Sequence, residues 1–176
     1  MKRYPETGGR DGFTLLELLV VIAIIAILAA LVLSTAGYVQ RKGATSRAEA
    51  EIAALSAALE SYKADMGDYP VGTNGDPAST NTPGTNNAFL RAALSPNGSN
   101  ALNPLNKVYF EFSKGMGPSG ASLTDTNVAV LDPFGEGYGY YYTPASGPAG
   151  KRNGTNFFDL WSRVSSTNTN AWIKNW

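Results

Sequence analysis

The chain has 176 residues but contains neither cysteine nor histidine. Without cysteine it can form no disulfide, thiolate metal site or cysteine nucleophile, and without histidine it lacks the usual general base. Four acidic residues of the C-terminal half are scattered among turns and strands with no catalytic motif around them: Asp125, Asp132, Glu136 and Asp159. We therefore expect no enzymatic activity.

The chain also lacks an excess of charge of either sign, because 14 Lys and Arg residues balance 14 Asp and Glu residues. A protein without a net field has no electrostatic preference for nucleic acid or for an anionic substrate. Its length leaves room for one domain beyond any membrane segment. We expect no nucleic-acid partner.

A long run without charged residues dominates the N-terminal third. Residues 18–33 are sixteen apolar residues in succession, and no charge follows Glu17 before Arg41. The twenty-one residues from Phe13 to Leu33 would span about 30 Å as a helix, which is the thickness of a hydrocarbon core. A segment that is apolar on every side is not a surface helix. The run therefore predicts a membrane-spanning helix.

The main alternative for such a run is a secretory signal peptide. The apolar part of a signal peptide usually has about 7 to 15 residues and precedes a small-residue cleavage site. Here the run is longer and continues without a turn into a helical pattern. The basic residues Lys2, Arg3 and Arg10 favour an N-terminus on the cytoplasmic side. The length of the run and its continuation into a helical pattern favour a retained helix over a cleaved signal peptide.

Glu17 is the one ionisable residue at the start of this apolar segment. A carboxylate inside a membrane costs about 2.5 kcal/mol or more unless it is paired. Glu17 therefore needs a partner, and a single buried polar contact of this kind is suited to setting the register between subunits.

The residues around Glu17 carry a resemblance to a known family. The sequence GFTLLE at positions 12–17, followed by LLVVIAIIAILAAL, resembles the N-terminal methylation motif of type IV pilins and type II secretion pseudopilins. The resemblance implies that a membrane-embedded prepilin peptidase cuts after Gly12 and methylates the new amino group of Phe13. It also implies that Glu17 pairs with the Phe13 amine of a neighbouring subunit during assembly.

A second helical pattern follows the apolar run. Apolar residues recur at spacings of three and four, which is typical of an amphipathic helix: Ile52, Leu55, Leu59, Tyr62 and Met66. Gly67 and Pro70 then signal its end. If the helix is continuous, it runs from Phe13 to Met66. Its second half is expected to pack its apolar stripe on the domain's own sheet.

The chain is thus expected to divide into a leader peptide, a transmembrane and filament-core half of the helix, and a periplasmic head, at residues 1–12, 13–36 and 37–176. The head contains the amphipathic half of the helix, a variable loop at 71–106 with a short helical segment around 88–94, and a sheet region at 107–176. Within that region, strands are predicted at residues 108–112, 127–131, 138–143 and 157–161. The expected fold class is α+β and pilin-like, with the long N-terminal helix packed on a small antiparallel sheet.

The C-terminal end raises the question of calcium. The residues at the helix end and in the sheet region resemble those of major pseudopilins, and this resemblance implies an aspartate-rich calcium loop before a final Ile-x-Asn-Trp stretch. The chain does end in IKNW at 173–176, but the preceding residues 163–172 read RVSSTNTNAW, without a carboxylate. We therefore expect no tight calcium site and no other cofactor. Trp172 and Trp176 are expected to hold the tail instead.

The resemblance implies a structural subunit of a periplasmic pseudopilus in a type II secretion system. Its implied partners are copies of itself, the prepilin peptidase, minor pseudopilins and the inner-membrane assembly platform. The precursor would lie in the bacterial inner membrane and the assembled filament in the periplasm. One alternative is a type IV pilin or minor pilin of a surface or DNA-uptake fibre. Another is a monomeric membrane-anchored binding module, for which Glu17 would be dispensable.

Overall fold

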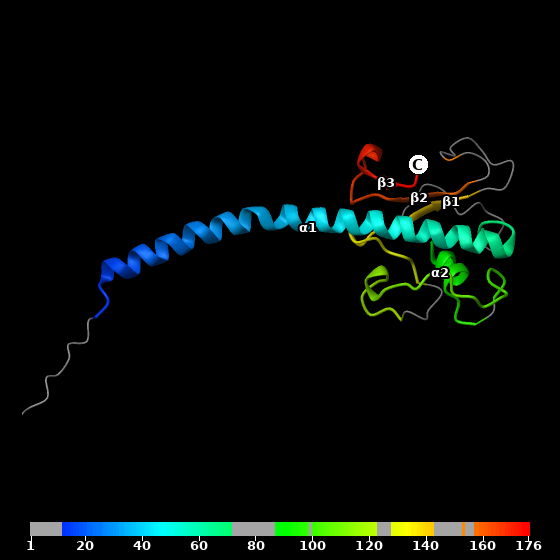
Figure 1. Cartoon of the computed structure of the whole chain (residues 1–176), viewed down its shortest axis with the longest axis horizontal. Helices are drawn as coiled ribbons and strands as arrows, with labels where there is room; N and C mark the ends of the chain where they lie inside the picture. Colours follow the sequence, from blue (N-terminus) through cyan, green and yellow to red (C-terminus); the bar gives the residue numbers. More distant parts are fainter. Residues whose placement is uncertain (1–11, 72–86, 99, 123–127, 143–152, 154–156) are drawn as a thin grey trace, which may run out of the picture. The chain divides into compact units, whose positions relative to one another are not determined.

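The computed structural model describes residues 12–71, 87–98, 100–122, 128–142, 153 and 157–176 (Figure 1). The chain divides into two compact units, Met1–Arg41 and Lys42–Trp176. One α-helix, α1 (Leu15–Met66), contributes to both of them. The predicted long helix is therefore confirmed, and it begins two residues later than expected.

The part of α1 within the first unit has no apolar side chain covered by the chain itself. Every residue from 12 to 35 is exposed, because a helix that is apolar on all sides has no single face to bury. Among the described residues, α1 is the helix that is long and apolar enough to cross a membrane.

The part of α1 within the second unit buries one face. The buried side chains follow the predicted stripe and add two alanines to it: Ala48, Ile52, Leu55, Ala58, Leu59 and Tyr62. Met66, at the end of the predicted stripe, is partly buried and packs against the same core. The amphipathic half of the helix is thus confirmed.

The end of α1 follows the signal read from the sequence. Gly67 adopts a left-handed conformation with a φ of 87°, and its N–H donates to the carbonyl of Lys63 at 2.8 Å. This is a helix C-cap that favours glycine, because a Cβ is strained at positive φ.

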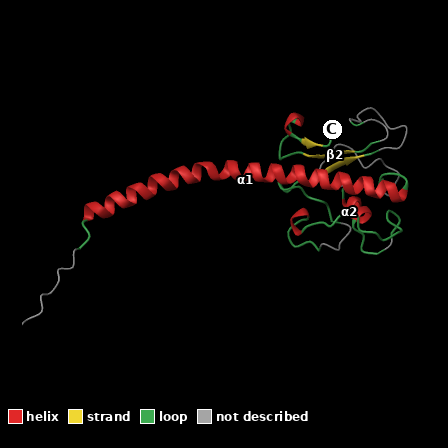
Figure 2. Cartoon of the chain, in the orientation of Figure 1, coloured by secondary structure: helices red, strands yellow, loops and turns green. Residues whose placement is uncertain are grey.

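The second unit contains a small antiparallel sheet of three strands in the order β1-β2-β3 (Figure 2). The strands are β1 (Gly139–Tyr141), β2 (Asp159–Ser162) and β3 (Ile173–Lys174). Tyr140 lies opposite Leu160, and Trp161 lies opposite Lys174 on its other side. In the view of Figure 1, the part of α1 in this unit passes between the sheet and the short helix α2 (Ala88–Leu94). The fold is pilin-like α+β, and the short helix lies where the sequence predicted it.

One hydrophobic core joins these elements. Its buried members come from α1, α2, the sheet and the intervening loops, and they include Leu55, Leu94, Met116, Phe158 and Leu160. Tyr69, just after α1, is among them and packs edge-on against Tyr142 and Phe158. The apolar stripe of α1 therefore packs on the domain's own core, as predicted.

The predicted strand at 108–112 is wrong. The N–H groups of Tyr109 and Phe110 both donate to the carbonyl of Leu94, at 2.7 and 3.1 Å. This segment is therefore held against the end of α2 rather than in a ladder. Its aromatic residues pack in or against the core from a loop rather than from a strand.

The predicted strand at 127–131 is also wrong over its described part. Only Leu131 forms an isolated bridge, with Gly137. The N–H of Val130 donates to the side chain of Asn87 at 3.0 Å, so a side chain has replaced a neighbouring strand as its partner. Asn127 lies outside the described residues.

The remaining strands differ at their ends. The strand predicted at 138–143 is β1, three residues long, and the strand predicted at 157–161 is β2, shifted toward Ser162. Thr143 lies outside the described residues. The third strand, β3, was not predicted at all, because two residues show no alternation.

Two buried asparagines take the place of longer strands in the head. Asn103 is fully buried and donates from its amide to the carbonyls of Ala93 and Lys107, at 2.7 and 2.8 Å. Asn87 is 4% exposed and donates to the carbonyls of Val130 and Tyr138, at 2.6 and 3.0 Å. Buried backbone groups need partners, and here side-chain amides supply them.

A buried arginine performs a similar role on α2. Arg91 is 1% exposed, and its guanidinium donates to the carbonyl of Met116 at 3.1 Å. The same group lies over the ring of Phe112, 4.5 Å from its centroid. Arg91 thus joins α2 to the loops that follow it.

Carboxylates on and just after α1 accept hydrogen bonds from tyrosine hydroxyls of the head. Tyr138 donates to Glu51 at 2.6 Å, and Tyr109 donates to Asp65 at 2.9 Å. Asp65 also pairs with Lys107 at 2.5 Å. These contacts tie the polar edges of α1 to the head, beside the apolar stripe.

Candidate functional site

The candidate site lies where α1 begins. Thr14 directly precedes the first helical residue, Leu15, and Glu17 lies in the first turn. The N–H of Thr14 donates to Oε2 of Glu17 at 2.9 Å, and the Thr14 hydroxyl donates to the same oxygen at 2.8 Å. The N–H of Glu17 lies 3.2 Å from Oγ1 of Thr14.

This geometry is a capping box, in which the N-cap hydroxyl and the carboxylate three residues later satisfy helix N–H groups reciprocally. A carboxylate in the first helical turn also interacts favourably with the positive end of the helix dipole. The sequence T-x-x-E at 14–17 signals such a box. Sequence reasoning considered the cost of Glu17 and a partner on a neighbouring subunit, and it missed this local partner.

The capping box leaves part of Glu17 uncommitted. Both hydrogen bonds from Thr14 fall on Oε2, and Oε1 takes part in neither of them. Thr14 also contributes no charge, so the negative charge of Glu17 is hydrogen-bonded but not neutralised. A cation that approached this end of the helix would find an oriented carboxylate.

The two predicted processing residues lie immediately before the box. Gly12 and Phe13 are outside the helix and exposed, Phe13 at 84%. A Cβ placed on Gly12 would meet nothing within 4 Å. Nothing in the described part of the chain therefore requires glycine at position 12, and a partner that approaches the backbone closely would be one reason for it.

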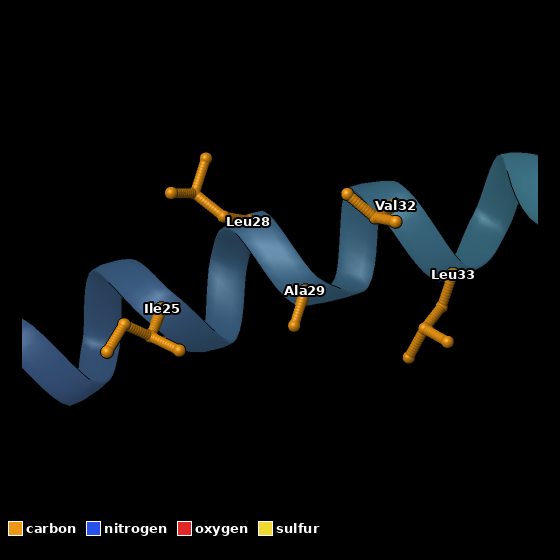
Figure 3. Close-up of a pocket in the computed structure, with 5 residues that line it drawn as sticks. All are labelled: Ile25, Leu28, Ala29, Val32 and Leu33. Atoms are coloured by element: carbon orange, nitrogen blue, oxygen red, sulfur yellow. The ribbon is translucent and has the colours of Figure 1, made fainter.

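The apolar surface of the first unit continues away from the site. A shallow hollow lies over Ala29 because larger side chains surround it (Figure 3): Ile25, Leu28, Val32 and Leu33. It is lined almost wholly by carbon, so it can take an apolar group and offers no means of binding a polar ligand.

No candidate metal site appears in the described part of the chain, where no three carboxylates come together. The loop that the family resemblance associates with calcium lies between β2 and β3. It includes a 3-10 helix, η2 (Thr169–Ala171), and contains no acidic residue. Its oxygen donors are hydroxyls, amides and carbonyls, which fit calcium poorly without carboxylates.

Comparisons with known proteins point to the same N-terminal region. A family model described as the prokaryotic N-terminal methylation motif matches residues 9–33. The chain is similar to the type II secretion system core protein G of Aeromonas hydrophila, with 42% identity over 74 residues that cover 42% of this chain and 52% of that protein. It is also similar to the core protein G of Escherichia coli K12, with 41% identity over 69 residues that cover 39% and 48% of the two chains.

The core protein G of Pectobacterium carotovorum gives a third match, with 41% identity over 68 residues that cover 38% of this chain and 44% of that protein. The chain thus spans about half the length of the curated relatives it matches. No solved structure matches it. The comparisons confirm the resemblance to the methylation-motif proteins and, over its N-terminal part, to core protein G.

Proposed function

We propose that this chain, homologous over its N-terminal part to type II secretion system core protein G, is a structural subunit of a pseudopilus. The observation that carries the proposal is the position of Glu17 within the matched region. Glu17 accepts a hydrogen bond from Thr14 at the N-terminal end of α1, where the apolar residues of the helix are exposed. Such a helix needs either lipid or other helices around it. When a subunit moves from the membrane into a filament, the helices of other subunits replace the lipid around its apolar helix.

Cleavage between Gly12 and Phe13 supplies what the site lacks. It removes residues 1–12 as a leader peptide and creates an amino group at Phe13, which the methylation motif would carry in N-methylated form. That amine is a cation, and Glu17 presents a carboxylate that Thr14 orients but does not neutralise. Pairing the Phe13 amine of one subunit with Glu17 of the next offsets the cost of a charge in an apolar environment.

The proposal also assigns a cellular location and a set of partners to the protein. The precursor is anchored in the inner membrane by residues 13–36, with its head in the periplasm. The partners are further copies of this chain, the prepilin peptidase, minor pseudopilins and the inner-membrane assembly platform. The protein performs no chemistry itself, and polymer growth drives the export of folded substrates.

Mass spectrometry of the mature N-terminus tests the processing step. Material from the assembled filament should begin at an N-methylated Phe13. A prepilin-peptidase-deficient strain serves as the control and should retain residues 1–12. Assembled material with an intact Met1 would overturn the proposal.

The substitution Glu17→Ala tests the assembly step. It should abolish filaments in a sheared fraction while the subunit still enters the membrane, because the apolar helix is unchanged. Glu49→Ala is the matched control, since Glu49 is exposed on the same helix outside the apolar segment. Normal assembly of Glu17→Ala would overturn the proposed role of Glu17, whereas the monomeric membrane-anchored binding module predicts no filaments from either the wild type or the variant. Secretion ATPase and secretin genes beside this one would support a pseudopilus, and a retraction ATPase gene would favour a pilus.

A further inference from the structure

We infer that the C-terminal loop of the head, residues 163–172, closes without a divalent cation and is held by a latch of three tryptophans. The family resemblance implies that calcium holds this loop. In this chain, the geometry indicates that contacts between side chains hold it instead. The inference concerns the folding of the head and does not depend on filament assembly.

The acidic groups nearest this loop in the fold are already engaged. Asp132 is 2% exposed, and its Oδ1 accepts from the N–H groups of Phe134 and Glu136, at 3.0 and 2.9 Å. Its Oδ2 accepts from the hydroxyl of Ser162 at 2.5 Å. A carboxylate with both oxygens used in this way is committed to the turn at 132–136 and to the end of β2.

The second acidic group, Glu136, lies beside a positively charged side chain of the loop. Arg163, the first residue of the loop, lies 3.6 Å from Glu136 between its Nε and Oε2. A divalent ion near Glu136 would have to displace Arg163 or bear the repulsion of its charge. The loop thus carries a positive charge of its own where calcium would need oxygen ligands.

Three oxygens within the loop accept hydrogen bonds from other loop residues. The hydroxyl oxygen of Ser166 accepts from the N–H of Asn168 at 3.1 Å, and the side-chain oxygen of Asn168 accepts from the N–H of Asn170 at 3.0 Å. The carbonyl of Ser166 accepts from the indole N–H of Trp172 at 2.9 Å. A calcium ion would have to compete with these donors for the three oxygens.

Trp161, Trp172 and Trp176 form the tryptophan latch. The rings of Trp161 and Trp172 stack at 6.1 Å with an interplanar angle of 6°, and Trp176 meets Trp161 edge-on at 6.0 Å. Offset stacking and edge-to-face contacts are the favourable arrangements of aromatic pairs. Trp161 belongs to β2 and is buried, so it anchors both ends of the loop and the tail beyond it.

Asn175 fastens the tail behind the latch. Its side-chain oxygen accepts from the N–H of Leu160 at 2.9 Å, and its amide donates to the carbonyl of Phe158 at 3.1 Å. Asn153 reaches the same oxygen at 3.1 Å. Hydrogen bonds and ring contacts therefore join the loop and the tail to β2, while the buried indole N–H of Trp161 and Nε of Arg163 have no hydrogen-bond partner among the described residues.

Thermal unfolding of the full-length protein in detergent tests the inference. Near-ultraviolet circular dichroism follows the packing of the tryptophans, first with about 5 mM calcium, above the range of weak calcium sites, and then with an excess of EGTA. We expect the two midpoints to differ by less than about 3 °C. A larger rise with calcium that EGTA reverses would overturn the inference, because a bound ion stabilises the folded state by mass action.

The substitution Trp172→Ala tests the latch itself, and Thr167→Ala, at an exposed position of the same loop, is its control. Trp172→Ala should lower the midpoint by about 5 °C or more and speed tryptic cleavage after Arg163, equally in calcium and in EGTA. Trp172→Phe, which keeps a ring but loses the indole donor, should fall between the two and guards against a variant that does not fold. Rescue of Trp172→Ala by calcium, or unchanged cleavage of this variant, would overturn the inference.

Discussion

Leu28 and Leu59 lie in the same helix, yet Leu28 is 57% exposed and Leu59 is fully buried. The difference comes from their neighbours in the sequence. Around Leu28 every face of α1 is apolar, and no element of its unit covers it. Around Leu59 charged residues alternate with the apolar stripe, and the stripe meets the core of the head.

The comparison shows that a helix that is apolar on every face and a helix that is apolar on one face have opposite needs. The first needs other molecules around it, and the second can pack within its own chain. A patterned helix can complete its own core, because its polar edges remain in water or meet polar partners such as Tyr138. A uniformly apolar helix can be satisfied only by lipid or by further chains. The following substitutions are designed to test this division, from the largest expected effect to the smallest.

The first prediction uses the two leucines directly. Leu59→Ala should lower the free energy of unfolding of the head by about 2–5 kcal/mol, because it leaves a cavity in a packed core. Leu28→Ala should change it by less than about 0.5 kcal/mol, since Leu28 is largely exposed in the described structure. Urea unfolding of both variants in detergent, followed by near-ultraviolet circular dichroism, measures the difference. Equal effects would contradict the division between the halves of α1.

The same division explains which features could be predicted from the sequence. The two halves of α1, its end at Met66 and the short helix at 88–94 were predictable, because each depends on local periodicity or on a glycine at a helix end. The N-terminal site was predictable as a motif, although the hydrogen bonds between Thr14 and Glu17 were overlooked in it.

The sheet region could not be predicted in the same way. Aromatic runs such as 108–112 satisfy strand propensity, but tertiary contacts gave their backbone groups other partners. Asn87 and Asn103 decide the path of these loops through contacts with residues distant in sequence or on another element. A short strand such as β3 exists only because β2 is there to pair with it. Such choices depend on the assembled fold rather than on local pattern.

The second prediction concerns the polar contacts on which the head relies. Asn87→Ala should lower the free energy of unfolding by about 2–3 kcal/mol, because it leaves the buried N–H of Val130 without its partner and removes one of the two donors to the Val130 carbonyl. Asn97→Ala, at an exposed position just after α2, should have an effect within about 0.5 kcal/mol. Urea unfolding of both variants provides the measurement. A large effect of Asn97→Ala would show that loss of an asparagine, rather than burial, is responsible.

The third prediction makes one substitution in each unit. A Cβ on Gly139 would lie 2.0 Å from the ring of Trp161, so Gly139→Ala should cost about 1–3 kcal/mol by forcing that ring and its latch partners to move. A Cβ on Gly37 would meet nothing within 4 Å, and alanine favours a helix over glycine, so Gly37→Ala should leave the head unchanged. Tryptophan near-ultraviolet dichroism should change only in Gly139→Ala. An unchanged spectrum there would contradict the close approach of Trp161.

The smallest effect is expected from pH, through the contacts between α1 and the head. Hydrogen bonds from Lys107 and Tyr109 lower the pKa of Asp65 below its usual value, so this contribution to stability is present above about pH 4 and is lost as pH falls through the lowered pKa. Desolvation and the contact with Asp65 raise the pKa of Tyr109 to about 12. The Tyr109 contribution is therefore complete below about pH 10 and is lost as pH rises toward about 12.

Urea midpoints measured across this range should form a plateau from about pH 5 to about pH 9, with a decline on both sides. Tyr109→Phe should make the alkaline decline shallower, because the group that must ionise is gone. Asp65→Asn should make the acid decline shallower for the corresponding reason. Glu49→Gln is the control, because Glu49 is an exposed carboxylate on the same helix, and it should leave both limbs in place. An alkaline limb that Tyr109→Phe leaves unaltered would show that the contact between Tyr109 and Asp65 contributes nothing to holding the head on this edge of α1.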